Sequence, residues 1–293
     1  MSSALLYSIT VLIWGSTWLA ITYQLGSVPP ELSVTYRFAL ASAILFIFSW
    51  VRRLPLRLSL REHAAIALQG SLIFCINYIL VYVSESYLTS GLVAIIFSTI
   101  VLLNVGFGAL FLRNPIRPRV VLGALVGTAG LVLIFWPELS KFKLSGGPAL
   151  GAALALASAI SASLGNIVSA WNLRRGLPVV QMNAYGMAYG AVFMLGYALL
   201  RGVPFRFDPS LPYVASLLYL VVFGSVIAFG SYLTLLSRIG PDRAAYVTVL
   251  FPVIALALST LFEGFSWSLL GALGVPLVLL GNSLALSRQS KSR

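Results

Sequence analysis

The sequence contains little charge, one cysteine and one histidine, and these shortages exclude several kinds of protein. Only 9% of the 293 residues are charged, whereas an ordinary soluble domain carries about 25%. A zinc site needs about four nitrogen, sulfur or oxygen ligands, and Cys75 and His63 cannot supply them. A single cysteine also excludes an internal disulfide. We therefore expect no metal and no cofactor.

Hydrophobic residues are abundant and make up 59% of the chain. This excess predicts an integral membrane protein, so the net charge of +12 does not indicate a nucleic-acid partner. A helix needs about 20 apolar residues to cross a bilayer. Runs of this kind predict ten membrane-spanning helices, at residues 4–22, 33–51, 64–84, 90–112, 120–136, 148–170, 179–200, 212–236, 244–262 and 268–286. The first run lacks the basic start of a signal peptide and is expected to be retained.

The basic residues gather in alternate loops and orient the chain. Of the 19 Lys and Arg residues, fourteen lie in loops on one predicted side or in the C-terminal tail, and four lie on the other side. Five of the seven acidic residues lie on the side that is poor in basic residues. Cytoplasmic loops of membrane proteins are enriched in Lys and Arg. We therefore expect a multi-pass protein of a bacterial inner (plasma) membrane, with both termini in the cytoplasm.

The two halves of the chain share a short pattern. Gly70-Ser71 followed by Tyr78 matches Gly224-Ser225 followed by Tyr232 at a constant offset. Five helices in each half make the second half cross the membrane in the opposite sense. The sequence therefore predicts an all-α membrane protein of two inverted five-helix repeats, residues 1–140 and 141–293, around a central cavity, which is a common transporter plan.

Two short motifs carry a family resemblance. Trp14-Gly15-Ser16, Arg37-Phe38 within "RFALASA" and the arrangement of five plus five helices resemble the ten-helix drug/metabolite transporter superfamily, most closely its EamA-type branch of amino-acid and metabolite exporters. The resemblance covers essentially the whole chain. It implies a basket of helices around a cavity, alternating access and export of small metabolites. One departure is Ser98, which stands where the second half has Pro252, so the hinge behaviour of the fourth helix is left open.

The first predicted helix provides two aromatic candidates for substrate contact. Trp14 and Trp18 lie four residues apart and share one helix face. Gly15 lies off that face and lets another helix approach closely, as small residues do in membrane bundles. The alternative is that the indoles face lipid or the interface.

The third predicted helix contains a polar stripe. Its members are Ser71, Cys75, Tyr78, Tyr82 and Glu85. At this spacing they share one face, which should point inward because an unpaired hydroxyl in hydrocarbon is costly. Tyr78 and Tyr82 are the first choice for substrate contacts, and hydrogen bonding between helices is the alternative.

The remaining candidates are polar residues of later helices and two charges. Ser163, Asn166, Tyr185 and Tyr246 complete the predicted substrate-binding set. Arg37 and Glu85 are possible charges at the outer mouth, where Arg37 could pair with Glu85 or attract a substrate carboxylate. The alternative for Arg37 is that its long side chain reaches the interface.

The pocket described by these residues is aromatic and poor in charge. It predicts a monomeric transporter, with a small molecule and the lipid bilayer as partners, that exports neutral or zwitterionic metabolites. Amino acids, including aromatic and hydrophobic ones, are the favoured class. No acidic residue lies deep in a predicted helix, so we expect no carboxylate proton relay.

The same pattern of residues leaves some other functions open and disfavours others. An exporter of nucleotide sugars, other metabolites or drugs, and a lipid scramblase, stay as alternatives. An enzyme would need a nucleophile with a base, or metal ligands, and a channel would need a filter motif. The sequence offers neither, so we expect a protein that is not an enzyme.

Overall fold

The protein is a bundle of helices. The computed structural model describes residues 1–24, 26–88, 90–140, 146–262 and 267–286, and no strand occurs in these ranges. The elements are α1 (Ser3–Thr22), α2 (Pro30–Val51), α3 (Leu60–Gly70), η1 (Ser71–Ile76), α4 (Asn77–Glu85), α5 (Ser90–Ser98), α6 (Ile100–Leu112), α7 (Pro118–Ile134), α8 (Trp136–Leu139), α9 (Gly146–Arg174), α10 (Val179–Leu200), α11 (Leu211–Tyr219), η2 (Leu220–Ile227), α12 (Ala228–Ile239), α13 (Pro241–Ala244), α14 (Val247–Phe262) and α15 (Leu269–Leu286). The predicted all-helical fold is confirmed.

Eight helical segments of the described chain are long and apolar enough to cross a membrane. The segments Leu60–Glu85 and Leu211–Ile239 reach this length because the π-helical stretches η1 and η2 each join two α-helices without a break. The helix α7 is apolar but shorter, and the 22-residue α10 packs along α2. The chain is therefore a multi-pass membrane protein. The full count of ten crossings and the inversion of the second half stay predictions.

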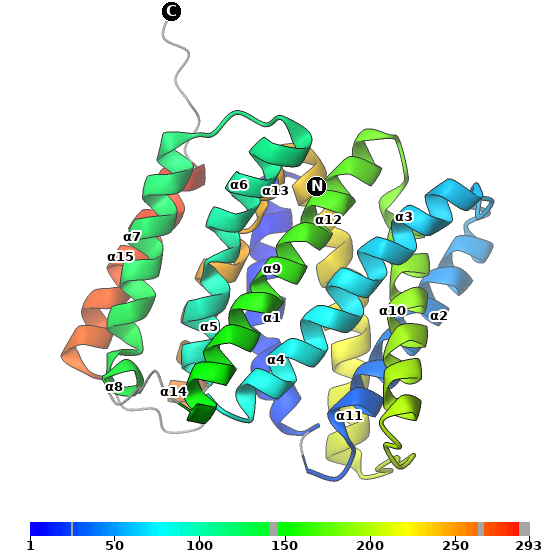
Figure 1. Ribbon diagram of the computed structural model, residues 1–293, viewed down its shortest axis with the longest axis horizontal. Helices are drawn as coiled ribbons and strands as arrows, with labels where there is room; N and C mark the ends of the chain where they lie inside the picture. The colour runs from blue at the N-terminus through cyan, green and yellow to red at the C-terminus, as the bar shows by residue number, and fades with distance from the viewer. Residues whose placement is uncertain (25, 89, 141–145, 263–266, 287–293) are drawn as a thin grey trace, which may run out of the picture.

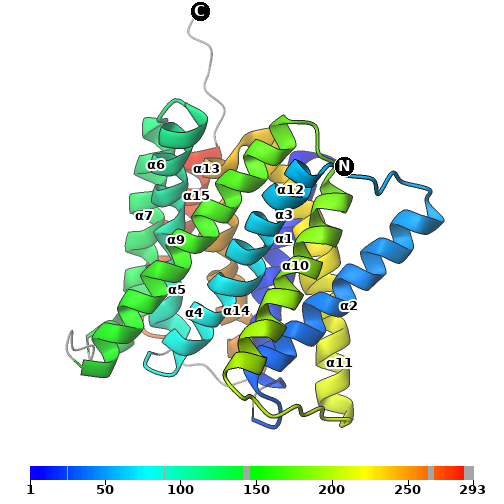
Figure 2. The same ribbon diagram turned by 45° about the vertical axis from the view of Figure 1, so that its right-hand side comes forward.

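The loops gather at two ends of the bundle. The loops 52–59, 113–117 and 175–178 lie at the same end as the N-terminus, and the loop residues 26–29 and 201–210 lie at the other (Figure 1). We call the first the basic end, because it contains the loops in which arginine is concentrated, and the second the opposite end. The helix pair α7 and α15 lies at one side of the bundle, and α2, α10 and α11 lie at the other (Figure 2).

At the opposite end, one carboxylate joins two loops. The Ser210 N–H donates to Asp208 Oδ1 at 2.8 Å, and Ser27 Oγ donates to Asp208 Oδ2 at 2.7 Å. These hydrogen bonds favour the ionised form and hold the pKa of the Asp208 carboxyl below its ordinary value. The loop between α1 and α2 is thereby tied to the loop between α10 and α11.

Glycines allow close helix contacts at two places. A Cβ atom added at Gly15 of α1 would lie 2.6 Å from the side chain of Ile254 in α14, which confirms the predicted close approach of another helix. Between α7 and α15, a Cβ atom at Gly130 would lie 2.6 Å from the carbonyl oxygen of Gly274. Such contacts stabilise membrane bundles, in which lipid removes the hydrophobic drive between helices.

Both halves of the chain contain a π-helical stretch at the matching Gly-Ser pair. The stretch η1 begins at Ser71, directly after Gly70, and η2 contains Gly224 and Ser225. π-Helical turns form hydrogen bonds from residue i to i+5 and are frequent at functional sites. Both stretches lie beside the cavity described next.

Candidate functional site

A cavity of about 180 Å³ lies between α1, α2, η1, α4, α5, α6, α9, α12 and α14, so both halves of the chain contribute to it. Its walls are largely apolar, and a few polar side chains face inward, as is usual in small-molecule sites. Six of the predicted site residues line it: Trp14, Arg37, Tyr78, Tyr82, Glu85 and Asn166. Thr17, Asn77 and Thr248 add further polar groups.

Aromatic rings form a continuous chain of contacts along the cavity. Successive ring centroids are 5.1 Å apart for Tyr232–Trp14, 5.0 Å for Trp14–Phe229, 4.8 Å for Phe229–Phe74, 4.9 Å for Phe74–Phe38 and 5.0 Å for Phe38–Tyr78. Tilted and edge-to-face pairs of this kind stabilise by about 0.5–1.5 kcal/mol each beyond area burial. Tyr232, Trp14, Phe229 and Tyr78 line the cavity, while Phe74 and Phe38 are buried outside its lining. The four lining rings, supported by the two buried ones, form an aromatic wall that can hold an apolar ligand.

Arg37 lies inside the bundle, with only 5% of its surface exposed. Its Nε donates to Ser225 Oγ at 2.9 Å, and its Nη2 donates to the Gly224 carbonyl oxygen at 3.2 Å. The guanidinium also lies 5.4 Å from the ring centre of Phe38 and 5.6 Å from that of Tyr78. The Gly224 oxygen additionally accepts a hydrogen bond from the Trp14 indole at 3.3 Å. Arg37 thus points into the cavity region instead of reaching the interface.

Glu85 is the last residue of α4 and lines the same cavity. Its Oε1 is buried, and it accepts no hydrogen bond from the described residues. Within the described ranges, the one ion pair is Arg117–Asp242, so neither Arg37 nor Glu85 has an ionic partner there. Tyr82 lies within electrostatic reach of both charges.

The cavity extends toward the opposite end of the bundle. Its lining includes Ile21, next to the last residue of α1, and Glu85 at the end of α4. On the other side the lining stops at Asn166 and Tyr232, about two turns before α9 and α12 end, and at Thr248, about two turns after the segment that begins at Pro241. The lining therefore reaches one end of the helices and not the other.

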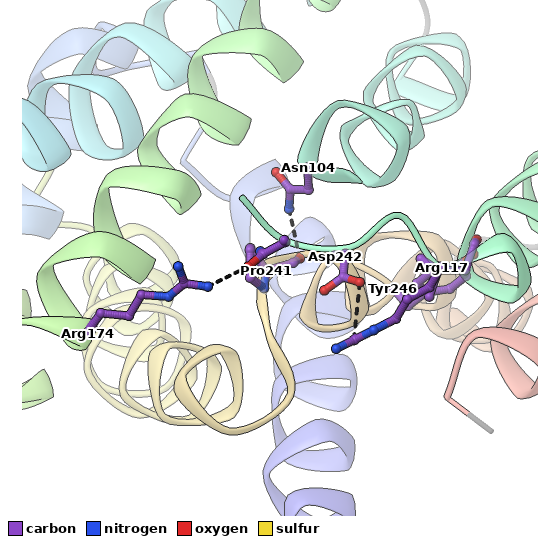
Figure 3. A network of polar contacts seen from close by, with 8 residues as sticks. Asn104, Arg117, Arg174, Pro241, Asp242 and Tyr246 are labelled. Atoms are coloured by element: carbon purple, nitrogen blue, oxygen red, sulfur yellow. Dashed lines mark hydrogen bonds and ion pairs between the residues drawn. The ribbon is translucent and has the colours of Figure 1, made fainter. Parts of the chain in front are cut away.

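Polar contacts join the helices at the basic end (Figure 3). Asn104 Nδ2 of α6 donates to the Pro241 carbonyl oxygen at 2.9 Å, and Ser163 Oγ of α9 donates to Asn104 Oδ1 at 2.6 Å. Arg117, just before α7, pairs with Asp242 of α13 at 3.4 Å. These contacts connect α6, α9 and α13 on the side of the cavity where its lining stops, and we call them the inner seal.

The structure places three predicted contact residues away from the cavity lining. Ser163 belongs to the inner seal, and the Tyr246 hydroxyl donates to a backbone carbonyl of α7. The Tyr185 hydroxyl donates to the Leu56 carbonyl oxygen at 2.9 Å, outside the cavity. The side chain of Trp18 lies outside the described part of the chain.

Three of the five residues of the polar stripe predicted on the third helix line the cavity, and two do not. Tyr78, Tyr82 and Glu85 line the cavity, but Ser71 Oγ bonds the Leu68 carbonyl oxygen on an exposed surface, and Cys75 is buried among α2 and α10. The reason is η1, because its wider turns change the phase of the helix between Cys75 and Tyr78. A regular 3.6-residue period could not reveal this shift, nor that Asn77 faces the cavity.

Taken together, these features define a multi-pass helical membrane protein with a small-molecule cavity between its two halves. A model of the EamA-like transporter family matches residues 1–136 and 149–287. The chain belongs to this family and is a membrane transporter, as the resemblance implied.

Relatives in other organisms support the assignment. The inner membrane transporter YedA of Escherichia coli K12 is 32% identical over 93% of this chain and 89% of its own length. The transporter YvbV of Bacillus subtilis is 29% identical over 92% of this chain and 88% of its own. A crystal structure with 20% identity superposes with a TM-score of 0.80 over 97% of both chains, which shows a shared fold. The relatives are named as transporters, which fits the expectation that this protein is not an enzyme.

Proposed function

We propose that this transporter exports small neutral or zwitterionic metabolites, with amino acids, including aromatic and hydrophobic ones, as the favoured class. The single observation that carries this proposal is the cavity, which combines an aromatic wall with a few hydroxyl and amide groups and one side chain of each charge. An apolar or aromatic side chain would pack on the rings, while polar ligand groups would meet Asn77, Asn166 and Thr248.

Transport would proceed by alternating access between the two halves. The cavity reaches the opposite end, whereas the inner seal closes the basic end, so this conformation corresponds to one that is open outward. Opening inward requires the contacts of Asn104 and the Arg117–Asp242 pair to break. The concentration of arginine at the basic end supports a cytoplasmic location for it and for both termini, in a bacterial inner membrane.

The two halves, residues 1–140 and 141–293, would act as inverted repeats within a monomer. Matching of the family model to two separate segments supports this division, as do the π-helical stretches at Gly70-Ser71 and Gly224-Ser225. Because Glu85, the one acidic side chain among the described cavity residues, lies at a helix end, we propose facilitated transport or exchange without a carboxylate proton relay.

Reconstitution into liposomes tests the proposed function. Labelled phenylalanine, leucine and threonine should enter preloaded vesicles by counterflow, and unlabelled amino acids should compete better than nucleotide sugars. Absence of counterflow with every amino acid, or preference for a nucleotide sugar, would reject the proposal. Movement of labelled lipid between leaflets would favour a scramblase. An imposed pH gradient should leave the rate unchanged, and strict dependence on the gradient would refute uncoupled transport.

A further inference from the structure

The cavity contains one basic and one acidic side chain that do not pair with each other. Arg37 on α2 and Glu85 at the end of α4 both line it, and no ion pair joins them. Two opposite charges in a largely apolar space would normally attract each other and form a salt bridge. Their separation leaves both available to a ligand.

Hydrogen bonds partly compensate the buried charge of Arg37, but no described residue serves as its counter-ion. Ser225 Oγ, the Gly224 carbonyl oxygen and two aromatic faces surround the guanidinium, and none of them has a full negative charge. The hydrogen bonds of Nε and Nη2 fix the orientation of the planar guanidinium, and Nη1 donates to none of the described residues. A guanidinium prepared in this way matches a carboxylate, which it binds more strongly than a neutral acceptor.

Glu85 provides the complementary acidic group, with one carboxylate oxygen that lacks a hydrogen-bond donor among the described residues. Its Oε1 is removed from solvent and accepts no hydrogen bond from the described residues, although a buried carboxylate oxygen without a donor is costly. An ammonium group has three donors and a positive charge, so it can satisfy this atom. Tyr82 lines the same cavity and lies within electrostatic reach of both side chains.

We infer that Arg37 and Glu85 form a two-point recognition site for an α-amino acid, with Arg37 binding the carboxylate and Glu85 binding the ammonium group. This inference rests on the proposed function, since it specifies the substrate that the cavity recognises. The aromatic wall then receives the side chain, and substrates must have both charged groups free.

Counterflow of labelled phenylalanine in liposomes tests the inference with two competitors that are no larger than the substrate. Phenethylamine lacks the carboxylate, and 3-phenylpropionate lacks the ammonium group. Each should compete about tenfold less well than phenylalanine against the unaltered transporter. In Glu85→Gln, the disadvantage of 3-phenylpropionate should shrink while that of phenethylamine remains. In Arg37→Gln, the reverse should hold.

Controls separate this role from a structural one. Glu31 is an acidic residue in the first turn of α2 that does not line the cavity. The control substitution Glu31→Gln should therefore leave both competition ratios unchanged. Arg37→Lys keeps the charge and should retain part of the discrimination against phenethylamine. If Arg37→Gln does not fold, the Glu85→Gln ratios decide, since Glu85 Oε1 bonds no described residue.

The outcomes also distinguish this inference from the proposed function. Unchanged competition ratios in Glu85→Gln, or equal competition by all three compounds in the unaltered transporter, would overturn the two-point site while amino-acid transport stands. Absence of counterflow with phenylalanine, leucine and threonine alike would reject the proposed function itself.

Discussion

At the scale of single residues, the aromatic wall depends on Trp14. Its indole contacts Phe229 and Tyr232 and donates a hydrogen bond to the Gly224 carbonyl oxygen that also accepts from Arg37. Removing this ring would open the wall and leave the carbonyl with one donor fewer. Recognition of an apolar side chain should therefore be sensitive to this position.

Trp14→Ala should weaken the apparent affinity for phenylalanine about tenfold, because an aromatic contact and a hydrogen bond are lost together. Competition in the counterflow assay measures the change. Trp50→Ala is the matched control, since Trp50 is 77% exposed at the end of α2 and should have no effect. Equal losses in the two variants would show that the indole of Trp14 does not contact substrate.

A substitution in the inner seal, at the Arg117–Asp242 pair, can test alternating access. The Arg117–Asp242 pair is partly exposed, so it would stabilise the proposed inward-closed conformation by about 1 kcal/mol at most. Asp242→Asn should then raise the population open to the basic end by up to about fivefold. Labelling of Ala162→Cys, a cavity position, from the cytoplasmic side should increase accordingly.

The control for this experiment is another arginine at the same end. Arg238 donates to the Met1 carbonyl oxygen at 2.6 Å on the exposed surface and takes no part in the inner seal. Arg238→Gln should leave the labelling rate unchanged. If Asp242→Asn also leaves it unchanged, the ion pair does not hold the inner side closed.

Residue-level positions were only partly predictable from the sequence. Trp14, Tyr78 and Asn166 could be placed because depth and helical spacing restrict where aromatic and amide groups point. Tyr185 and Tyr246 could not, because they also satisfy hydrogen bonds with carbonyl oxygens of other segments. The sequence alone does not distinguish a tyrosine that lines the cavity from one that donates a hydrogen bond to a backbone carbonyl oxygen.

At the scale of elements, the contact between α1 and α14 depends on Gly15. A side chain there would meet Ile254 within 2.6 Å. Gly15→Ala should therefore destabilise the protein by about 1–3 kcal/mol, as overpacking does, and thermal unfolding in detergent should show a lower midpoint. Gly106→Ala in α6 is the control, because no atom lies within 4 Å of the added methyl group. There the midpoint should stay or rise, since alanine favours helix; a similar fall in both would contradict close packing at Gly15.

The fourth predicted crossing shows how a helix can be interrupted without proline. The helix α5 ends at Ser98 and α6 begins at Ile100. Ser98 Oγ donates to the Ile95 carbonyl oxygen at 2.6 Å, and Thr99 Oγ1 donates to that of Ile96 at 2.7 Å. Hydroxyls that bond back to carbonyls compete with the helical pattern and bend helices. The absence of proline left this point open, and the structure places the interruption between Phe97 and Ile100, which both line the cavity.

At the scale of the whole molecule, the coarse architecture followed from hydropathy and charge, whereas the helix phase did not. Long apolar runs and arginine-rich alternate loops recur along the chain, so an error at one position does not change the prediction. They predicted the helices and the two ends of the bundle. The π-helical stretches η1 and η2 are single local events without a compositional signature. They nevertheless decide which side of the third and eighth predicted helices meets the cavity.

The proposed orientation can be tested with cysteine labelling of intact cells. In a Cys75→Ser background, Phe205→Cys should react with a membrane-impermeant maleimide from outside, because Phe205 is 60% exposed in the loop 201–210. Ile116→Cys, 62% exposed at the basic end, is the matched position and should react only after the membrane is disrupted. The opposite pattern would reverse the predicted topology.

The glycine-lined contact between α7 and α15 has a consequence for how the molecule can move. These helices come from different halves of the chain, yet their backbones touch, with the positions of Gly130 and Gly274 leaving no space for even a methyl group. Surfaces that meet this closely cannot slide past each other without collision. Under the proposed alternating access, α7 and α15 would stay together as a fixed axis, and the other helices would turn about this pair when the cavity opens to either face of the membrane.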